Sequence, residues 1–116
     1  MKSEMFISST DVSVLVNNLI KGSVQVIAPC SGAGGNVDYK ILSNASEWAT
    51  SGKLPRKSLK EFFLPVTEPL LEWVDKKQDV DVKPATVPPV KRVVFGAKPC
   101  DVAALPIVDK VMDWDY

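Results

Sequence analysis

The sequence predicts one α/β (α+β) domain over residues 1–116, in which a small mixed sheet with a β-hairpin packs against several short helices. Three features predict this class: an apolar stripe of helical period, short β-branched runs typical of strands, and glycine or proline between these segments. The chain has 116 residues, 46% hydrophobic and 24% charged, which is an ordinary globular composition. It is therefore long enough to bury a core without disulfide or metal staples.

The first helix is predicted by apolar residues at positions i, i+3, i+4, i+7 and i+8, which are Val12, Leu15, Val16, Leu19 and Ile20. Ser9 or Thr10 is expected to cap its first N–H groups, and Gly22 is expected to end it. Residues 23–28 come next and predict a strand, because the run is short and rich in β-branched side chains. Pro29 is expected to end this strand.

The glycine-rich segment 30–36 is predicted to be the turn of a β-hairpin. Residues 37–42 follow it with alternating apolar and polar side chains, which is the period of a half-buried strand. The glycines at 32, 34 and 35 also suggest nucleotide binding, but a phosphate-binding loop is followed by a helix, and here a strand follows. The hairpin turn is therefore the favoured interpretation.

The middle of the chain carries weaker signals. Residues 45–49 can form a helical turn that carries Trp48. The segment Ser58-Leu59-Lys60-Glu61 resembles a capping box and predicts a short helix that continues through Leu64. A second short helix is expected after Thr67, with the apolar set Leu70, Leu71, Trp73 and Val74.

Residues 75–89 are rich in charge and proline, and they predict an exposed loop in which residues 80–82 could add a short edge strand. The aromatic side chains expected to fill the space between helix and sheet are Phe62, Phe63 and Trp73. Trp114 and Tyr116 crowd the last three positions, where a continuation of the chain, a partner or the domain itself is expected to cover them.

The last third of the chain predicts a strand, a tight connection and a helix. Residues 91–95 form an apolar run with a charged start, and residues 96–101 form the connection. The expected helix carries the apolar set Val102, Leu105, Val108, Val111 and Met112. Pro106 lies inside this set and is expected to kink the helix or shift its start.

Composition excludes several classes of function. Fourteen Lys and Arg residues balance fourteen Asp and Glu residues, so the excess positive charge of a nucleic-acid binder is absent. No apolar run resembles a signal peptide or a membrane span, and only two cysteines are present, so we expect a cytoplasmic protein that binds neither nucleic acid nor membrane. Histidine is absent, which removes the commonest general base and metal ligand. The chain is therefore not expected to be an autonomous enzyme.

The segment Lys98-Pro99-Cys100-Asp101 is the strongest candidate site. It lies between the end of a predicted buried strand and the start of a predicted helix, which is the usual place for ligands in α/β sheets. The positive end of the helix and Lys98 would favour a thiolate at Cys100, whereas Asp101 would oppose it by like charge but would make a good helix cap. The plainer alternative is a buried small thiol beside a capping carboxylate. Cys30 is far away in sequence, and two thiols are too few for a metal centre.

Two ordered segments carry a resemblance to a known family. They are Ser58-Leu59-Lys60-Glu61-Phe62-Phe63-Leu64-Pro65-Val66-Thr67-Glu68 and Val94-Phe95-Gly96-Ala97-Lys98-Pro99-Cys100-Asp101-Val102-Ala103-Ala104-Leu105, followed by Asp109-Lys110-Val111. With them the chain resembles the N-terminal region of a family of iron–sulfur electron-transfer subunits, typified by those of anaerobic sulfite reductase and by the beta subunit of sulfhydrogenase. Lys98 stands where that family usually has Arg. Lysine keeps the positive charge but lacks the planar guanidinium group that can bind a carboxylate or phosphate through two hydrogen bonds.

The resemblance implies that the chain is the α/β domain preceding a ferredoxin-like region, with 4Fe-4S clusters in that continuation or in separate redox subunits. It also implies that Cys100, which matches the cysteine of the family motif, completes or flanks such a cluster, with Lys98 and Asp101 as neighbouring cofactor-binding residues. No complete cluster is expected within this chain.

Three functions follow from these observations, in order of preference. The first is an accessory or scaffold domain of an iron–sulfur oxidoreductase subunit, serving electron transfer in an anaerobic complex of hydrogenase or sulfite-reductase type. The second is a free-standing ligand-binding or regulatory module, with the glycine loop and the Pro99-Cys100-Asp101 turn lining a pocket. The third is an enzyme with Cys100 as nucleophile, which is disfavoured because no histidine can activate the thiol.

Overall fold

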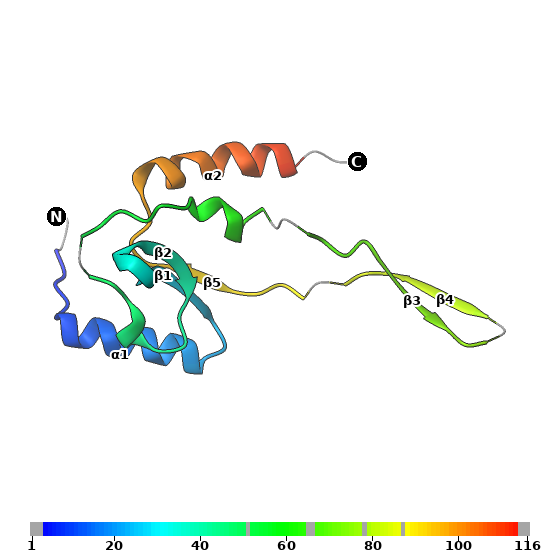
Figure 1. Ribbon diagram of the computed structural model, residues 1–116, viewed down its shortest axis with the longest axis horizontal. Coiled ribbons are helices and arrows are strands. Elements are labelled where there is room, and N and C mark those ends of the chain that lie inside the picture. Colours follow the sequence, from blue (N-terminus) through cyan, green and yellow to red (C-terminus); the bar gives the residue numbers. More distant parts are fainter. Residues whose placement is uncertain (1–3, 51, 65–66, 78, 87, 114–116) are drawn as a thin grey trace. The chain divides into compact units, whose positions relative to one another are not determined.

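The computed structural model describes residues 4–50, 52–64, 67–77, 79–86 and 88–113 (Figure 1). In these ranges the chain forms two α-helices, five strands and short 3-10 turns, arranged as a small mixed sheet and a separate β-hairpin. The predicted α+β class is confirmed. The chain divides into two compact units, the first made of Met1–Leu59 and Val90–Tyr116, and the second of Lys60–Pro89.

Helix α1 spans Ser9–Lys21 and is capped one residue earlier than predicted. The side chain of Ser8 accepts a hydrogen bond from the Asp11 backbone N–H at 3.1 Å and donates to the Asp11 carboxylate at 2.6 Å. The assignment of the cap to Ser9 or Thr10 is therefore wrong, because the first turn already includes both residues. Gly22 ends the helix as predicted, and its N–H donates to the Asn18 carbonyl.

The first unit is built around strand β1 (Gln25–Ser31), which lies between β2 (Val37–Ile41) and β5 (Arg92–Val94). The β1–β2 pair is antiparallel, which confirms the hairpin, and the β1–β5 pair is parallel. Both faces of β1 are covered, since five consecutive residues of the strand are buried. In Figure 1, α1 lies on one side of this sheet and α2 on the other.

The buried cluster on the α1 side of the sheet consists of Val16, Val26, Ala28, Cys30, Leu42 and Ala45. Side chains alternate along a strand, so Ile27 and Pro29 of β1 point to the opposite face, together with Tyr39, which pairs with Pro29. Leu59 is also buried, with 2% of its surface exposed. The predicted amphipathic stripe of α1 is confirmed at Val16, which is fully buried, whereas Leu15 is 43% exposed.

Strand β1 does not end at Pro29, and this part of the prediction is wrong. The Leu42 N–H donates to the Val26 carbonyl, so every second residue from Val26 directs its backbone groups to β2. Pro29 is out of phase with this set, so its missing N–H faces away from β2, beyond the end of β5. Its carbonyl accepts from the Ala49 N–H at 2.7 Å. Proline is tolerated here because no ladder hydrogen bond is lost.

Two short helical segments predicted from the sequence form 3-10 turns. The predicted helical turn before Trp48 is a 3-10 turn over Ala45–Glu47. Trp48 stacks at an angle on Phe95, with ring centroids 5.2 Å apart, and both rings pack against the α1-side cluster. The short helix predicted after Ser58 is a 3-10 turn over Leu59–Phe62.

The second unit contains a two-stranded antiparallel hairpin of β3 (Leu71–Asp75) and β4 (Val80–Pro84). The helix predicted after Thr67 is therefore wrong, whereas the strand predicted at residues 80–82 is confirmed. The apolar residues of β3 pair with those of β4 across the hairpin, and this pairing outweighs the weak helical spacing of residues 70–74. Trp73 does not fill a core as predicted, because 72% of its surface is exposed, and Phe63 is 37% exposed.

Helix α2 spans Pro99–Met112 and passes through Pro106 without interruption. It starts well before this proline, so the predicted shift of its start is wrong. Pro106 is exposed, so the Val102 carbonyl that it leaves without an N–H donor can bond to water. Neither α1 nor α2, the α-helices of the described ranges, is long and apolar enough to span a lipid bilayer. The prediction about Trp114 and Tyr116 lies outside the described residues.

Gly96 offers a direct test of the contact between the end of β5 and β1. Its φ is +68°, and an added Cβ would lie 3.2 Å from both Cγ and Cδ of Pro29. Gly52 has the same φ but no atom within 4 Å of an added Cβ. Gly52→Ala is expected to cost only the left-handed backbone strain, about 1–2 kcal/mol. Gly96→Ala is expected to cost about 1–3 kcal/mol more through overpacking.

The measurement is the free energy of unfolding from urea titrations of the two variants and the parent chain. Equal losses at the two glycines would contradict the close packing of Gly96 on Pro29.

Candidate functional site

The candidate site is the connection between β5 and α2, at the carboxyl end of a strand that runs parallel to β1. The Phe95 N–H donates to the Ile27 carbonyl at 2.9 Å, which prolongs the β1–β5 pairing by one bond. Gly96 then turns the chain against Pro29, and Lys98 takes the cap position of α2. Pro99 follows at the first helical position, where its fixed φ suits the helix and its missing N–H costs nothing. The predicted strand, turn and helix are confirmed.

Asp101 lies in the first turn of α2 and is the buried charged residue of the described chain, with 5% of its surface exposed. Its carboxylate accepts from the Ser58 hydroxyl at 2.7 Å and from the Leu59 N–H at 3.4 Å. Lys98 approaches it to 3.8 Å. Asp101 is therefore not the helix cap that the sequence predicts, because the cap position belongs to Lys98. It joins the start of α2 to residues more than forty positions earlier.

The Lys98 side chain makes a second long-range contact at this turn. Its side chain is 21% exposed, and its ammonium group donates to the Pro55 carbonyl at 3.4 Å in addition to its ion pair with Asp101. A charge that is largely withdrawn from water needs such partners. Lys98 thus connects the β5–α2 turn with the segment that ends at Pro55.

Tyr39 is a member of the site that the sequence analysis missed. It is 4% exposed, and its hydroxyl donates to the Gly96 carbonyl at 3.0 Å. Burial raises the pKa of this phenol, and the negative charges of Asp101 and Cys100 add to the rise, while a hydrogen bond from the Lys98 backbone lowers it. The phenol therefore stays neutral well above neutral pH. Tyr39 lies two positions after Val37 in an alternating strand, which indicated an inward side chain but not its partner Gly96 in the β5–α2 turn.

The two cysteines have opposite environments. Cys100 is exposed at the second position of α2, whereas Cys30 is buried in the α1-side cluster, and both are free thiols. The Cys30 thiol donates to the Ala28 carbonyl at 3.5 Å. Burial raises the pKa of Cys30, with a further rise from Glu47 and an opposing effect of Lys40. Because Cys30 belongs to the α1 side of the sheet and α2 lies on the other side, the fold does not bring the two thiols to one site (Figure 1).

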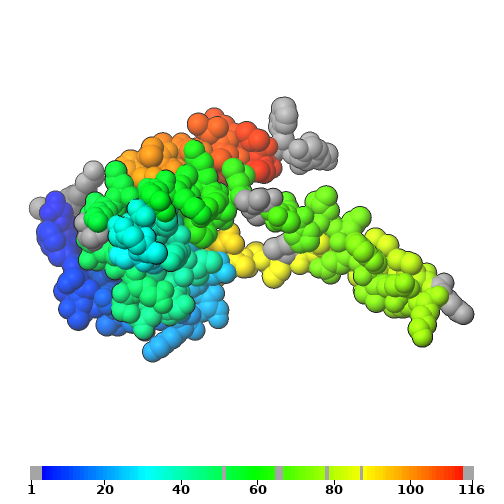
Figure 2. All heavy atoms as spheres, viewed as in Figure 1, coloured from blue at the N-terminus to red at the C-terminus, as the bar shows by residue number. Residues whose placement is uncertain are grey.

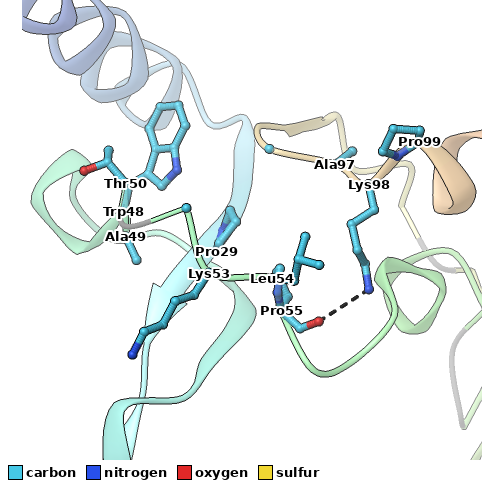
Figure 3. Close-up of a pocket in the computed structure, with 12 residues that line it drawn as sticks. Pro29, Trp48, Ala49, Thr50, Lys53, Leu54, Pro55, Ala97, Lys98 and Pro99 are labelled. Carbon is cyan, nitrogen blue, oxygen red and sulfur yellow. Dashed lines mark hydrogen bonds between the residues drawn. The ribbon is translucent and has the colours of Figure 1, made fainter.

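A pocket of about 280 Å³ adjoins the β5–α2 turn (Figure 3). Its described lining comes from Pro29, the segments Trp48–Thr50 and Gly52–Pro55, and the turn Gly96–Pro99. Figure 3 shows the Lys98 side chain reaching toward the Pro55 carbonyl, while Lys53 extends away from it. Lys53 donates instead to the Gly35 carbonyl at 3.2 Å. The pocket is thus polar at one end, at Lys98, and otherwise lined mainly by apolar groups and backbone.

The glycine loop is the turn between β1 and β2 and lies at the surface, in cyan in Figure 2. Gly34 and Gly35 have φ values of +74° and +73°, which explains why glycine stands there. The strand β2 follows the loop, as the sequence predicted, so the loop does not lead into an α-helix. The described lining of the pocket beside Lys98 contains no residue of this loop.

Fold and site together define the class of this chain. Its first unit is a mixed α+β domain in which a strand–turn–helix connection presents one exposed thiol above a buried carboxylate. Within the described ranges, no group of three or more His, Cys, Asp or Glu side chains could hold a metal ion. Comparison with known protein families, with curated proteins and with solved structures found no match to this chain.

The contact of Asp101 with Ser58 and Leu59 is expected to be a major source of stability for the first unit. Asp101→Ala would leave the Leu59 N–H and the Ser58 hydroxyl without this acceptor, at a cost of about 1–3 kcal/mol. Asp109→Ala is the matched control, because Asp109 lies exposed on the same helix. The check is the free energy of unfolding from denaturant titration. A double-mutant cycle with Ser58→Ala is expected to give a coupling of about 0.5–3 kcal/mol, and additive losses would contradict the contact.

The thiols are expected to differ sharply in reactivity. In the folded chain at neutral pH, iodoacetamide is expected to modify Cys100 and to spare Cys30, because Cys30 is buried and its raised pKa lowers its thiolate fraction. Modification of Cys30 is expected only as the pH rises above the ordinary cysteine pKa of about 8.5, or on unfolding. Intact-mass analysis of Cys30→Ala and Cys100→Ala variants measures both rates. Equal rates in the two variants would contradict this difference in exposure.

Proposed function

We propose that this chain is an accessory or scaffold domain of an iron–sulfur oxidoreductase subunit, serving electron transfer in an anaerobic complex of hydrogenase or sulfite-reductase type. The observation that carries the proposal is the contact between Ser58 and Asp101. These two residues come from the two separate segments that resemble the family. The contact gives a physical reason for the two motifs to occur together, because one motif buries the carboxylate of the other.

Cys100 is the residue proposed to touch the cluster. It is exposed at the start of a helix whose first turn is anchored by Asp101 and Lys98, so its position relative to the sheet is defined. A four-iron cluster is usually held by four cysteine thiolates, and the second cysteine of this chain, Cys30, is buried elsewhere. The donor set of this chain therefore fits one cluster ligand. Under the proposal, the remaining ligands come from a ferredoxin-like continuation or from separate redox subunits.

The roles proposed for Lys98 and Asp101 are positioning roles. Both side chains bind protein groups, Pro55 and Ser58 among them, and both hold the turn from which Cys100 projects. The lysine charge beside an anionic cluster would also be favourable. We further propose that the protein works in the cytoplasm, where thiols stay reduced, and that its partners are redox proteins rather than nucleic acid or membrane.

The second candidate is a free-standing ligand-binding or regulatory module. The pocket of about 280 Å³ beside Lys98 favours it, because ligands of α/β sheets bind at the carboxyl ends of strands. Its described lining differs from the one anticipated, since Trp48–Thr50 and Gly52–Pro55 take the place of the glycine loop. Of the Pro99-Cys100-Asp101 turn, this described lining includes Pro99 and neither of the other two residues. This candidate predicts ligand binding without iron, so the iron content of the protein distinguishes it from the first candidate.

The test is the iron content of the chain purified anaerobically with its ferredoxin-like continuation or partner subunit. Cys100→Ala is expected to lower the iron and the visible absorbance of the complex by the equivalent of one cluster, or to remove one cluster's signal in electron paramagnetic resonance. Cys30→Ala is the matched control and is expected to leave both unchanged. Unchanged iron and an unchanged spectrum in Cys100→Ala would overturn the role of this thiol.

A further inference from the structure

The first unit contains a further pocket, which neither candidate function uses. Its volume is about 390 Å³, and small-molecule sites in proteins measure about 300–1,000 Å³. The end of β1, one residue of β2 and the segment around the 3-10 turn Ala45–Glu47 form its described lining, which consists of Cys30, Ser31, Lys40, Ser46, Glu47, Trp48 and Ala49. Trp48 and Ala49 also line the pocket beside Lys98, whereas the other five residues do not.

The wall formed by the 3-10 turn is fixed to both the helix and the sheet. The Ala45 N–H donates to the Asn17 side chain at 3.1 Å, which joins the turn to α1. The Ala49 N–H donates to the Pro29 carbonyl at 2.7 Å, which joins the segment after the turn to β1. Because both ends of this short segment are held, the backbone at Glu47 has a defined position before any ligand binds.

Two opposite charges line this pocket without pairing with each other. Lys40 and Glu47 both belong to the lining, but the ion pairs among the described residues do not include one between them. The Glu47 carboxylate accepts a hydrogen bond from the Ser43 N–H at 3.2 Å, which orients the side chain and leaves its second oxygen for another donor. Burial raises the pKa of Cys30, Glu47 raises it further and Lys40 lowers it, so both charges act near this thiol.

The neighbouring acidic residue on β2 already has a cationic partner. Asp38 lies opposite Cys30 and forms an ion pair with Arg56 at 3.3 Å. Neither Asp38 nor Arg56 belongs to the described lining of the pocket. The lining thus offers one positive and one negative group. A ligand of a single sign would be attracted by one of these groups and repelled by the other.

We propose that this pocket binds a free amino acid with an apolar side chain, held as a zwitterion between Lys40 and Glu47. The ligand's carboxylate accepts hydrogen bonds from the Lys40 ammonium group, and its ammonium group donates to the Glu47 carboxylate. The hydroxyls of Ser31 and Ser46 supply further polar contacts. The Trp48 ring gives the ligand's side chain an apolar surface.

Solvent sets the strength of this binding. Lys40 and Glu47 are both exposed, and ion pairs between exposed groups are weak and are screened by salt. The dissociation constant is therefore expected in the millimolar range, and it is expected to rise with ionic strength. Binding here requires neither Cys100 nor Lys98, so this inference is independent of both candidate functions.

Three probes with the same branched carbon chain separate the contributions of the two charges. L-Leucine carries both charged groups, isocaproate lacks the ammonium group, and isopentylamine lacks the carboxylate. In heteronuclear NMR titrations of the 116-residue chain at low salt, leucine is expected to bind about fivefold or more tightly than either analogue. The backbone amides of Gly96–Lys98 are expected to stay in place, while leucine shifts those of Ser31, Lys40, Ser46 and Glu47.

Substitutions assign each charge of the ligand to its partner. Lys40→Met keeps an unbranched side chain and is expected to abolish the preference for leucine over isopentylamine. Glu47→Gln keeps an acceptor for the Ser43 N–H and is expected to abolish the preference for leucine over isocaproate. Lys21→Met and Glu72→Gln are the matched controls, because both residues are exposed and lie outside this pocket. Both controls are expected to keep the affinity for leucine within about twofold.

Several outcomes would overturn the proposal. An NMR spectrum of the parent chain that leucine leaves unchanged up to its solubility limit would show that the pocket binds no amino acid. Equal affinities for the three probes would mean that apolar contact alone causes the binding. Shifts confined to Gly96–Lys98 would assign the ligand to the other pocket. Preferences in Lys40→Met and Glu47→Gln that match those of the controls would remove the two charges from the site.

Discussion

A carboxylate that is withdrawn from water must be surrounded by donors, and Asp101 meets this requirement with groups from a distant part of the chain. The Ser58 hydroxyl, the Leu59 N–H and the Lys98 ammonium group all turn toward it. Leu59, next to the donor, is itself buried, so a polar clasp and an apolar contact fix the same segment. An unpaired carboxylate at this depth would cost several kcal/mol, so the segment at 58–59 and the start of α2 are obliged to stay together.

This obligation explains why α2 holds its place with little apolar burial. Along the helix, Asp101 is the buried residue, and only Ala104, Leu105 and Val108 are half-buried. The first turn is therefore anchored through polar contacts, while the last turns expose Val111 and Met112, at 62% and 65%. Anchoring concentrated at one end defines the position of the residues in that end, and Cys100 is among them. A thiol on a defined turn but outside the core is accessible without being loosely held.

The sequence predicted most elements of the first unit, because the stripe around Val16 and the glycine turn before β2 are local signals. The prediction that Pro29 ends the strand was wrong because a strand tolerates proline wherever its missing N–H has no hydrogen-bond acceptor on a neighbouring strand. Only the register with β2 shows that this is so at Pro29. The contacts of Tyr39 with Gly96 and of Ser58 with Asp101 join positions 57 and 43 apart, which no period in the sequence encodes. In the second unit, residues 70–74 suit a short helix as well as a strand, and their pairing with β4 decided between the two.

The two units differ in how they cover apolar surface and pair their charged groups. In the first unit, β1 is covered on both faces and the buried carboxylate of Asp101 finds partners within the chain. In the second unit, Asp81 and its two lysines complete the polar face, whereas the apolar face has no cover among the described residues of that unit. The second unit thus keeps an apolar ribbon face that its own described residues do not cover. The proposed ligation through Cys100 depends on a further polypeptide segment, because one thiol contributes to a cluster only when other residues supply the remaining ligands.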